Sequence, residues 1–289
     1  MATKRRRQSI TEATNKTKRA KFTLDSARLP EITTGGVVLV TGAGDVGQLG
    51  LGPDVLEKSR PALVNLNHEI VDICAGGMHT VCLTTEGKDS HGNMGMTLKG
   101  NEKLPFQIIK DVHIIKIASG ADHIVFLSNH GQVYTCGCAE QGQLGRTTER
   151  GSSRNARSGI AKLLLPAPIS LKPSLKLHFD NIWAATYGTF CKVANSDDIF
   201  VFGLNNYNQL GLKSLTPQYM PKLSKEFSKY KWNIISSGQH HTISLDEDGK
   251  VYAIGRKEYG RLGLGKDCED AAELQLVSTL EDKKVINVS

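Results

Sequence analysis

The sequence predicts an all-β protein, a β-propeller built from sequence repeats, and three observations lead to this prediction. A glycine–leucine phrase recurs along the chain, a glycine–histidine phrase recurs with the same rhythm, and short apolar runs alternate with polar turns between them. A repeat of about 50 residues indicates a solenoid or a propeller. A helical solenoid would show apolar residues at helical spacing, and no such stretch exceeds two turns, so the pattern favours the propeller.

The first phrase has the form Gly-x-Leu-Gly, with Asn in place of the first glycine in one copy. Clear copies occupy residues 47–50, 142–145, 208–211 and 260–263, and a degenerate copy occupies 92–95. Their central residues follow one another at intervals of 45, 50, 66 and 52 positions: Leu49, Met94, Leu144, Leu210 and Leu262. Because the chain must turn tightly here, we expect positive φ angles, which glycine adopts at little cost. The leucine is expected to fill the space between neighbouring blades.

The second phrase places a histidine three residues after a glycine. It occupies residues 75–80, 119–123 and 237–242, and a weak copy without the histidine occupies 184–189. The repeat histidines are His79, His123 and His241. Histidines that recur once in each repeat do not converge on one site, so we expect structural side chains whose ring nitrogens bond loop carbonyls.

The residues between the two phrases predict short antiparallel strands. A β-branched apolar run follows the histidine phrase, as at 124–127, and a polar turn comes next, as at 129–132. Another strand then begins at residues such as Val133, and a further candidate precedes each histidine phrase, as at 114–117. Three or four such strands in each unit of about 50 residues form one propeller blade.

The net charge of +7 resides in a short N-terminal segment. Residues 1–30 contain nine Lys or Arg and two acidic residues, whereas the remainder contains 27 basic and 27 acidic residues. We therefore predict two parts, a disordered basic tail over 1–34 and repeats over 35–289. The tail carries two basic clusters, made of Lys4, Arg5, Arg6, Arg7, Lys16, Lys18, Arg19 and Lys21. Such clusters suit a bipartite signal for a nuclear import receptor and neutralise DNA phosphates, and a merely solubilising tail is the alternative.

The sequence also disfavours several classes of protein. No window approaches the roughly 18 apolar residues of a membrane helix, and six cysteines are too few for a disulfide scaffold. Residues 42–47 match the GxGxxG pattern of dinucleotide-binding proteins, but Gly50, Gly52 and Pro53 would break the helix that this pattern requires. No Cys or His spacing fits a metal, and no catalytic triad is recognisable. We expect no cofactor, no metal, no membrane contact and no covalent catalysis.

In their order and rhythm, three phrases resemble the repeats of the regulator of chromosome condensation family: Gly-Gly-Met-His-Thr at 76–80, Asp-Gly-Lys-Val-Tyr at 248–252 and Gly-Gln-Leu-Gly-Leu-Gly at 47–52. The resemblance covers residues 35–289. It implies a nuclear, chromatin-associated propeller that acts as a guanine nucleotide exchange factor for the small GTPase Ran. In this family one face of the propeller stabilises the nucleotide-free GTPase, and no covalent bond is made or broken.

The resemblance also implies residues for a GTPase-facing surface, namely Asp45, Asp122, Arg146 and His240. Asp122 and His240 each stand immediately before a repeat histidine. The residue at this position differs between copies of the repeat, and it is Met78 in another copy. A further stretch, 89–96, resembles the hairpin that the family inserts beside the phosphate loop of the GTPase. Its candidate contact residues are Asp89, Ser90, His91, Gly92, Asn93 and Met94.

The second face of the propeller is implied to bind chromatin. The long loop 147–162 stretches one repeat interval to 66 residues and carries Arg150, Arg154, Arg157 and Lys162. It resembles a family loop that docks on the acidic surface of the histones, while the tail reaches nucleosomal DNA. Arginine suits clustered carboxylates because its guanidinium bonds them with two donors. The alternative is a solvated loop with incidental charge.

The chain departs from the family pattern of seven blades. We expect about five, with one repeat's length deleted at the 88/89 junction and a C-terminus truncated within the last repeats. The result would be an open arc or a smaller closed ring of five blades. Two other functions stay open, a chromatin-binding scaffold without exchange activity and a propeller that binds some other protein.

Overall fold

A computed structural model of the chain describes residues 34–87, 90–93, 102–152 and 159–289. Within these ranges the protein is all-β, with four four-stranded antiparallel sheets, one two-stranded sheet and a few short helices. In each four-stranded sheet, the strands lie side by side in the order in which the chain forms them. This up-and-down order is that of propeller blades and confirms the predicted fold class.

The two-stranded sheet comes first in the chain and consists of β1 (Leu39–Ala43) and β2 (Glu57–Leu63). Blade 1 consists of β3 (Ile70–Ala75), β4 (Thr80–Thr84), β5 (Ser90–Asn93) and β6 (Phe106–Ile109). Blade 2 consists of β7 (Ile114–Ser119), β8 (His123–Ser128), β9 (Val133–Gly137) and β10 (Ala167–Pro168). Blade 3 consists of β11 (Phe179–Ala184), β12 (Gly188–Val193), β13 (Ile199–Gly203) and β14 (Gln218–Leu223). Blade 4 consists of β15 (Trp232–Ser237), β16 (His241–Asp246), β17 (Val251–Gly255) and β18 (Ala271–Leu276).

The helical segments are short and lie in the connections. Helices α1 (Glu149–Ser152) and α2 (Gly159–Leu164) lie between β9 and β10, within the long insertion of blade 2. Three 3-10 turns follow later in the chain: η2 (Phe227–Lys229), η3 (Glu258–Gly260) and η4 (Ser278–Leu280). Among the described residues, no helix has both the length and the hydropathy that a membrane span requires.

The core lies between neighbouring blades. Every residue of β8 and of β13 is buried, on both faces of the sheet. This is expected of a propeller, because each face of a blade meets another blade and must be apolar. The first strands approach one another, since β7 contacts β3 and β11 contacts β7. Blades 3 and 4 share an apolar cluster that includes Trp183, Phe190, Leu210, Trp232 and Tyr252.

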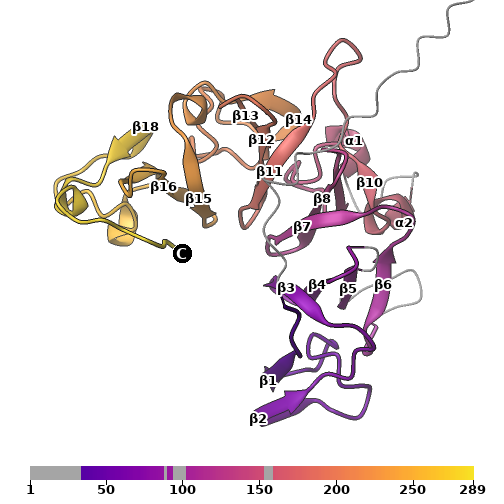
Figure 1. The fold of residues 1–289 in the computed structure, drawn as a ribbon. Coiled ribbons are helices and arrows are strands. Elements are labelled where there is room, and N and C mark those ends of the chain that lie inside the picture. Colours follow the sequence, from indigo (N-terminus) through magenta and orange to yellow (C-terminus); the bar gives the residue numbers. More distant parts are fainter. Residues whose placement is uncertain (1–33, 88–89, 94–101, 153–158) are drawn as a thin grey trace, which may run out of the picture.

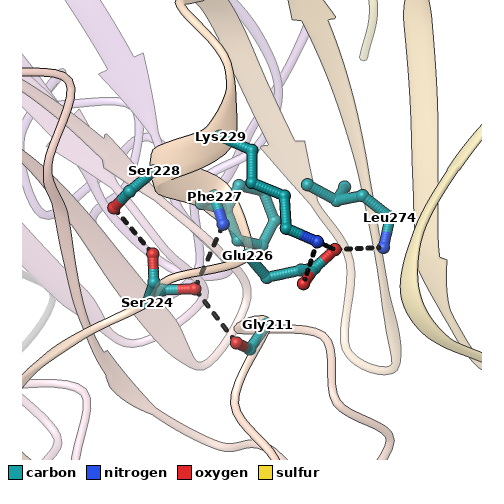
Figure 2. A network of polar contacts seen from close by, with 7 residues as sticks. All are labelled: Gly211, Ser224, Glu226, Phe227, Ser228, Lys229 and Leu274. Atoms are coloured by element: carbon teal, nitrogen blue, oxygen red, sulfur yellow. Dashed lines mark hydrogen bonds and ion pairs between the residues drawn. The ribbon is translucent and has the colours of Figure 1, made fainter.

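Polar contacts also join blades 3 and 4. Figure 2 shows the connection between β14 and β15, where the Ser224 hydroxyl donates to the Gly211 carbonyl at 3.1 Å. The Glu226 carboxylate pairs with the Lys229 ammonium at 2.8 Å and accepts the Leu274 N–H of β18 at 3.2 Å. This carboxylate therefore fastens the end of one blade to the outer strand of the next.

The blades follow one another along an open arc, with β1 and β2 at one end and β18 at the other (Figure 1). The two ends of the arc lie well apart in this view. The described residues thus form four complete blades and one two-stranded sheet, an incomplete propeller as predicted. The described residues do not form a closed ring of five blades, which was the alternative prediction.

The Gly-x-Leu-Gly phrases form tight turns, as predicted. The N–H of the last glycine donates to the carbonyl three residues earlier, for example from Gly145 to Gly142 at 3.0 Å. The first residue of the turn has a φ of 96° at Gly47, 84° at Gly142 and 60° at Asn208. The central leucines are buried, namely Leu49, Leu144, Leu210 and Leu262. No helix begins at Gly47, where the dinucleotide-binding pattern would require one.

Strand β5 differs from the protruding hairpin expected for this stretch. Residues Ser90–Asn93 pair with β4 on one side and with β6 on the other. A strand with hydrogen-bonded neighbours on both edges is part of the blade sheet, because its backbone groups are already used. Asp89 and Met94 lie outside the described residues. The 88/89 junction falls between β4 and β5, outside the described residues, so a deletion there stays a prediction.

Candidate functional site

One end of every blade carries a repeated pair of loops. In an up-and-down sheet, the loop between strands 1 and 2 and the loop between strands 3 and 4 emerge at the same end. The first loop contains the histidine phrase, and in blades 2, 3 and 4 the second loop contains the Gly-x-Leu-Gly turn. The residue before the histidine therefore stands at this end in each blade: Met78, Asp122, Tyr187 and His240. Tyr187 precedes Gly188, which replaces the histidine in blade 3.

Glycine at the end of the third strand holds this residue in place. In blades 2, 3 and 4 that glycine has a φ of +116°, +118° and +119° (Gly137, Gly203 and Gly255). A Cβ atom there would lie 2.3–2.4 Å from the carbonyl oxygen of the residue before the histidine position. The next N–H donates to the same carbonyl, as from Arg256 to His240 at 2.9 Å. Only glycine permits this close approach.

Two of the repeat histidines, His79 and His123, link their blade to the next, which supports a structural role for these two, whereas the Nδ1 of His241 in blade 4 is buried without a hydrogen-bond partner among the described residues. The His79 Nε2 lies 2.6 Å from the Ser119 hydroxyl, and the His123 Nε2 lies 3.0 Å from the Thr189 hydroxyl. The partners of these two Nε2 atoms are thus hydroxyls of the following blade, where loop carbonyls were expected, and a backbone hydrogen bond with Gly188 also acts on His123. Burial lowers the pKa of His79 and lowers that of His123 to about 3. Both rings are therefore neutral at neutral pH.

Between blades 2, 3 and 4 the two kinds of loop enclose a polar hollow. Its lining includes Asp122 of blade 2 and His240 of blade 4, two of the residues predicted to face a GTPase. The structure brings them together although 118 positions separate them in the sequence. Tyr187, Glu140 and Asn206 also line the hollow. It contains acceptors, donors and an imidazole, so it suits a polar protein surface better than an apolar ligand.

Glu140 and Asn206 were among the lining residues missed in the sequence analysis, although a signal for these two exists. Glu140 and Asn206 stand two residues before the first residue of a Gly-x-Leu-Gly turn, as Asp45 does. The glutamine of the phrase orders this position in two copies, because the Gln48 side chain donates to the Asp45 carboxylate at 3.1 Å and the Gln209 side chain donates to the side-chain Oδ1 of Asn206 at 3.0 Å. The first of these bonds lowers the pKa of Asp45.

Asp45 itself is not brought to the hollow. It lies exposed between β1 and β2, on the two-stranded sheet, and the hollow is lined by blades 2 to 4. It occupies the equivalent loop at the same end of its sheet, so it extends the row of polar loop residues along the arc. The end of the blades that carries this row, from Asp45 to His240, is called the loop face below.

Models of known protein families show what this repeat is. The repeat of the regulator of chromosome condensation matches residues 35–83, 130–186, 196–245 and 248–289, and a second model of the same repeat matches 114–143. The chain belongs to the regulator of chromosome condensation family. The predicted resemblance is therefore confirmed.

Individual members of the family show how far the similarity extends. The chain is 38% identical to the regulator of chromosome condensation of Xenopus laevis, over 83% of this chain and 72% of the relative. It is 34% identical to the human protein of that name, over 96% of this chain and 80% of the relative. Prp20p of Saccharomyces cerevisiae, solved in a study of its binding to Gsp1p and histones, superimposes with a TM-score of 0.68 at 24% identity. That alignment covers 86% of this chain and 60% of the yeast chain, and it shows the shared fold.

Arg146, the third residue predicted for the family's GTPase-facing surface, is engaged inside the chain. Its Nε donates to the Thr135 carbonyl of β9 at 3.2 Å. Its terminal nitrogens donate to the carbonyls of Lys162, Leu163 and Leu165, at 2.9, 3.2 and 3.0 Å. These carbonyls lie at the C-terminal end of α2, so the guanidinium fastens the long insertion to its blade. Arg146 does not line the hollow.

The residues predicted to bind chromatin are only partly described. Arg150 in α1 and Lys162 in α2 are exposed, on an insertion that leaves and rejoins blade 2 at the loop face, the same end as Asp122 and His240 and not the second face expected for this loop. Arg154 and Arg157 lie outside the described residues, as does the basic tail with both of its clusters. Within the described residues, no group of three His, Cys, Asp or Glu side chains is arranged to hold a metal ion.

Proposed function

We propose that this chain is a guanine nucleotide exchange factor for the GTPase Ran, acting in the nucleus on chromatin. The observation that carries this proposal is the convergence of Asp122, Tyr187 and His240, from three blades, on one polar hollow. The family membership supports it, and the related Prp20p was studied for its binding to Gsp1p and histones. The chain spans 72% and 80% of the two animal relatives and 60% of the yeast chain, so the activity of a whole relative does not transfer automatically.

The proposed mechanism needs no covalent step. A surface that binds the nucleotide-free GTPase more tightly than the nucleotide-bound form lowers the barrier to nucleotide release. The hollow offers carboxylates at Asp122 and Glu140 and an imidazole at His240. These groups can compensate charges that the GTPase exposes when its nucleotide and magnesium leave.

The release of fluorescent GDP from Ran tests this proposal. We expect micromolar protein to accelerate release, and we expect Asp122→Ala or His240→Ala to reduce the acceleration by about tenfold or more. Asp248→Ala is the matched control, because Asp248 is exposed in the turn between β16 and β17, at the other end of blade 4. Absence of acceleration, or an equal loss from Asp248→Ala, would contradict the proposal.

Chromatin binding is proposed for the basic tail and for the insertion. The tail concentrates the net charge of +7, and Arg150 and Lys162 add exposed positive charge on the insertion. Binding to DNA phosphates releases counterions, so the affinity should fall steeply as salt is raised. Nucleosome affinity should also collapse when residues 1–30 are deleted. An affinity that is indifferent to salt and to this deletion would rule the proposal out.

The tail is also proposed as the signal that a nuclear import receptor reads. Its two clusters have the spacing of a bipartite signal. A yeast member of the family was solved in complex with Kap60. Replacement of Lys4 to Arg7 and of Lys16 to Lys21 by alanine should leave a fluorescent fusion protein in the cytoplasm. Unchanged nuclear accumulation would contradict this part of the proposal.

A further inference from the structure

Among the described residues, no hydrogen bond is seen to the ring of His240. Its Nδ1 is buried without a hydrogen-bond partner in the described part of the chain. The backbone of His240 is fixed by the bond from the Arg256 N–H, but this bond leaves rotation of the side chain free. The orientation of the ring on the hollow must therefore come from packing.

Tyr207 supplies this packing from the neighbouring blade. Its ring meets the His240 ring edge to face, with 5.1 Å between the centroids and 70° between the planes. Tyr207 lies in the loop between β13 and β14, where its N–H donates to the Gln209 side chain at 2.8 Å. The amide of Gln209 also donates to the carbonyl of Gln239 at 3.0 Å. The loop that carries Tyr207 is thus fastened to the residue next to His240.

Arg256 also contacts the Tyr207 ring. The carbon of its guanidinium lies 4.9 Å from the centre of the Tyr207 ring, a cation–π contact. The guanidinium also pairs with the Glu258 carboxylate. Arg256, Tyr207 and His240 therefore form a stack that spans blades 3 and 4 at the loop face, and Glu258 holds its outer member.

We propose that Tyr207 and Arg256 are positioning residues that fix the His240 ring in the orientation in which it contacts the GTPase. This inference rests on the proposed exchange function and extends it to two residues that do not line the hollow. A partner then meets a preorganised surface, and less binding energy is lost in ordering it.

Burial and the positive charges around His240 favour the neutral form of its ring. Burial lowers the pKa of His240, and the positive charges of Arg256 and Arg261 lower it further, against the opposing effect of Glu258. The neighbouring His241 ring is also less basic than usual, because burial lowers its pKa. Tyr207 packs against the ring, and the carboxylates of Asp122 and Glu140 line the same hollow. The ring is therefore presented as a neutral imidazole at neutral pH.

A double-mutant cycle on the exchange rate tests the positioning role. We expect Tyr207→Ala to slow exchange about fivefold, and Tyr207→Phe to recover most of this loss because the ring is retained. In a His240→Ala background, Tyr207→Ala should have no further effect. Additive losses, or a Phe variant as slow as the Ala variant, would overturn the inference.

A second measurement separates this inference from the exchange function. The titration of His240, followed by NMR of its ring protons, should shift to higher pH in Arg256→Ala, because a nearby positive charge is removed. Lys257→Ala is the matched control, since Lys257 is the next residue and pairs outward with Glu269 at 2.8 Å. If wild type lacks exchange activity but the titration shifts as described, the proposed function fails and the positioning stands. An unchanged titration in Arg256→Ala would overturn the positioning.

Discussion

Single glycines at the ends of the third strands set the geometry of the loop face. Gly255 has a φ of +119°, and a Cβ there would lie 2.4 Å from the His240 carbonyl oxygen. We expect Gly255→Ala to lower the free energy of unfolding by more than about 2 kcal/mol, because the strained backbone and the clash add. Gly265→Ala is the control, since its φ is +98° but no atom lies within 4 Å of the added carbon. Urea unfolding measures the free energy of unfolding of both variants. Equal decreases in the two variants would contradict the clash with the His240 carbonyl as a cause of the loss.

The sequence identified some residues of the site and missed others for physical reasons. Asp122 and His240 were recognisable because each directly precedes a repeat histidine, and this histidine identifies the equivalent position in each copy. Tyr187 was missed because its copy of the phrase has Gly188 in place of that histidine. The engagement of Arg146 was not predictable, because its carbonyl partners lie 16 to 19 positions later in an insertion that follows no repeat.

At the scale of the element, buried histidines connect one blade to the next and make the fold sensitive to acid. The pKa of His123 is lowered to about 3 in the folded chain, against 6.5 for the ordinary group. Between these values the unfolded chain binds more protons, so stability falls as the pH falls. At pH 5.5 this one group should cost on the order of 1 kcal/mol relative to pH 8. Urea unfolding at several pH values should show this slope, and His123→Asn should reduce it. If the free energy of unfolding depends on pH equally steeply in His123→Asn, the acid sensitivity does not come from His123.

The repeated strands were predictable from the sequence, whereas the connections were not. The apolar run 124–127 lies within β8 and the run 114–117 lies within β7, because alternating turns and β-branched residues specify hairpins locally. Strand β5 was not expected, since Ser-His-Gly-Asn at 90–93 has little strand propensity and is held by pairing with β4 and β6. The tertiary context overrides the local preference there.

At the scale of the whole molecule, the arc has one weak end in the two-stranded sheet. Strands β1 and β2 pair with each other, and Val37, Leu39 and Leu63 are between 59% and 77% exposed. A two-stranded sheet is marginally stable, whereas the inner strands of complete blades are covered on both faces. Hydrogen exchange followed by mass spectrometry should show fast exchange in β1 and slow exchange in β8. Equal protection of the two strands would indicate that the end of the arc is covered in solution.

The family comparison supports a proposal about the internal gap. The repeat models match the chain up to residue 83 and again from 114, and the unmatched stretch includes the 88/89 junction. Blade 1 takes β3 and β4 from before the junction and β5 and β6 from after it. We propose that a repeat's length was lost between equivalent points of two repeats, since such a loss leaves a complete four-stranded blade.

The central claim is that the GTPase docks on the loop face, over the hollow that Asp122, Tyr187 and His240 share. Photo-cross-linking tests this most directly, with a photoreactive phenylalanine analogue placed at Tyr187 or, as the control, at Asp248. With nucleotide-free Ran, the account predicts a cross-linked product from position 187 and none from position 248. A product from position 248 without one from position 187 would place the GTPase at the other end of the blades and contradict the account.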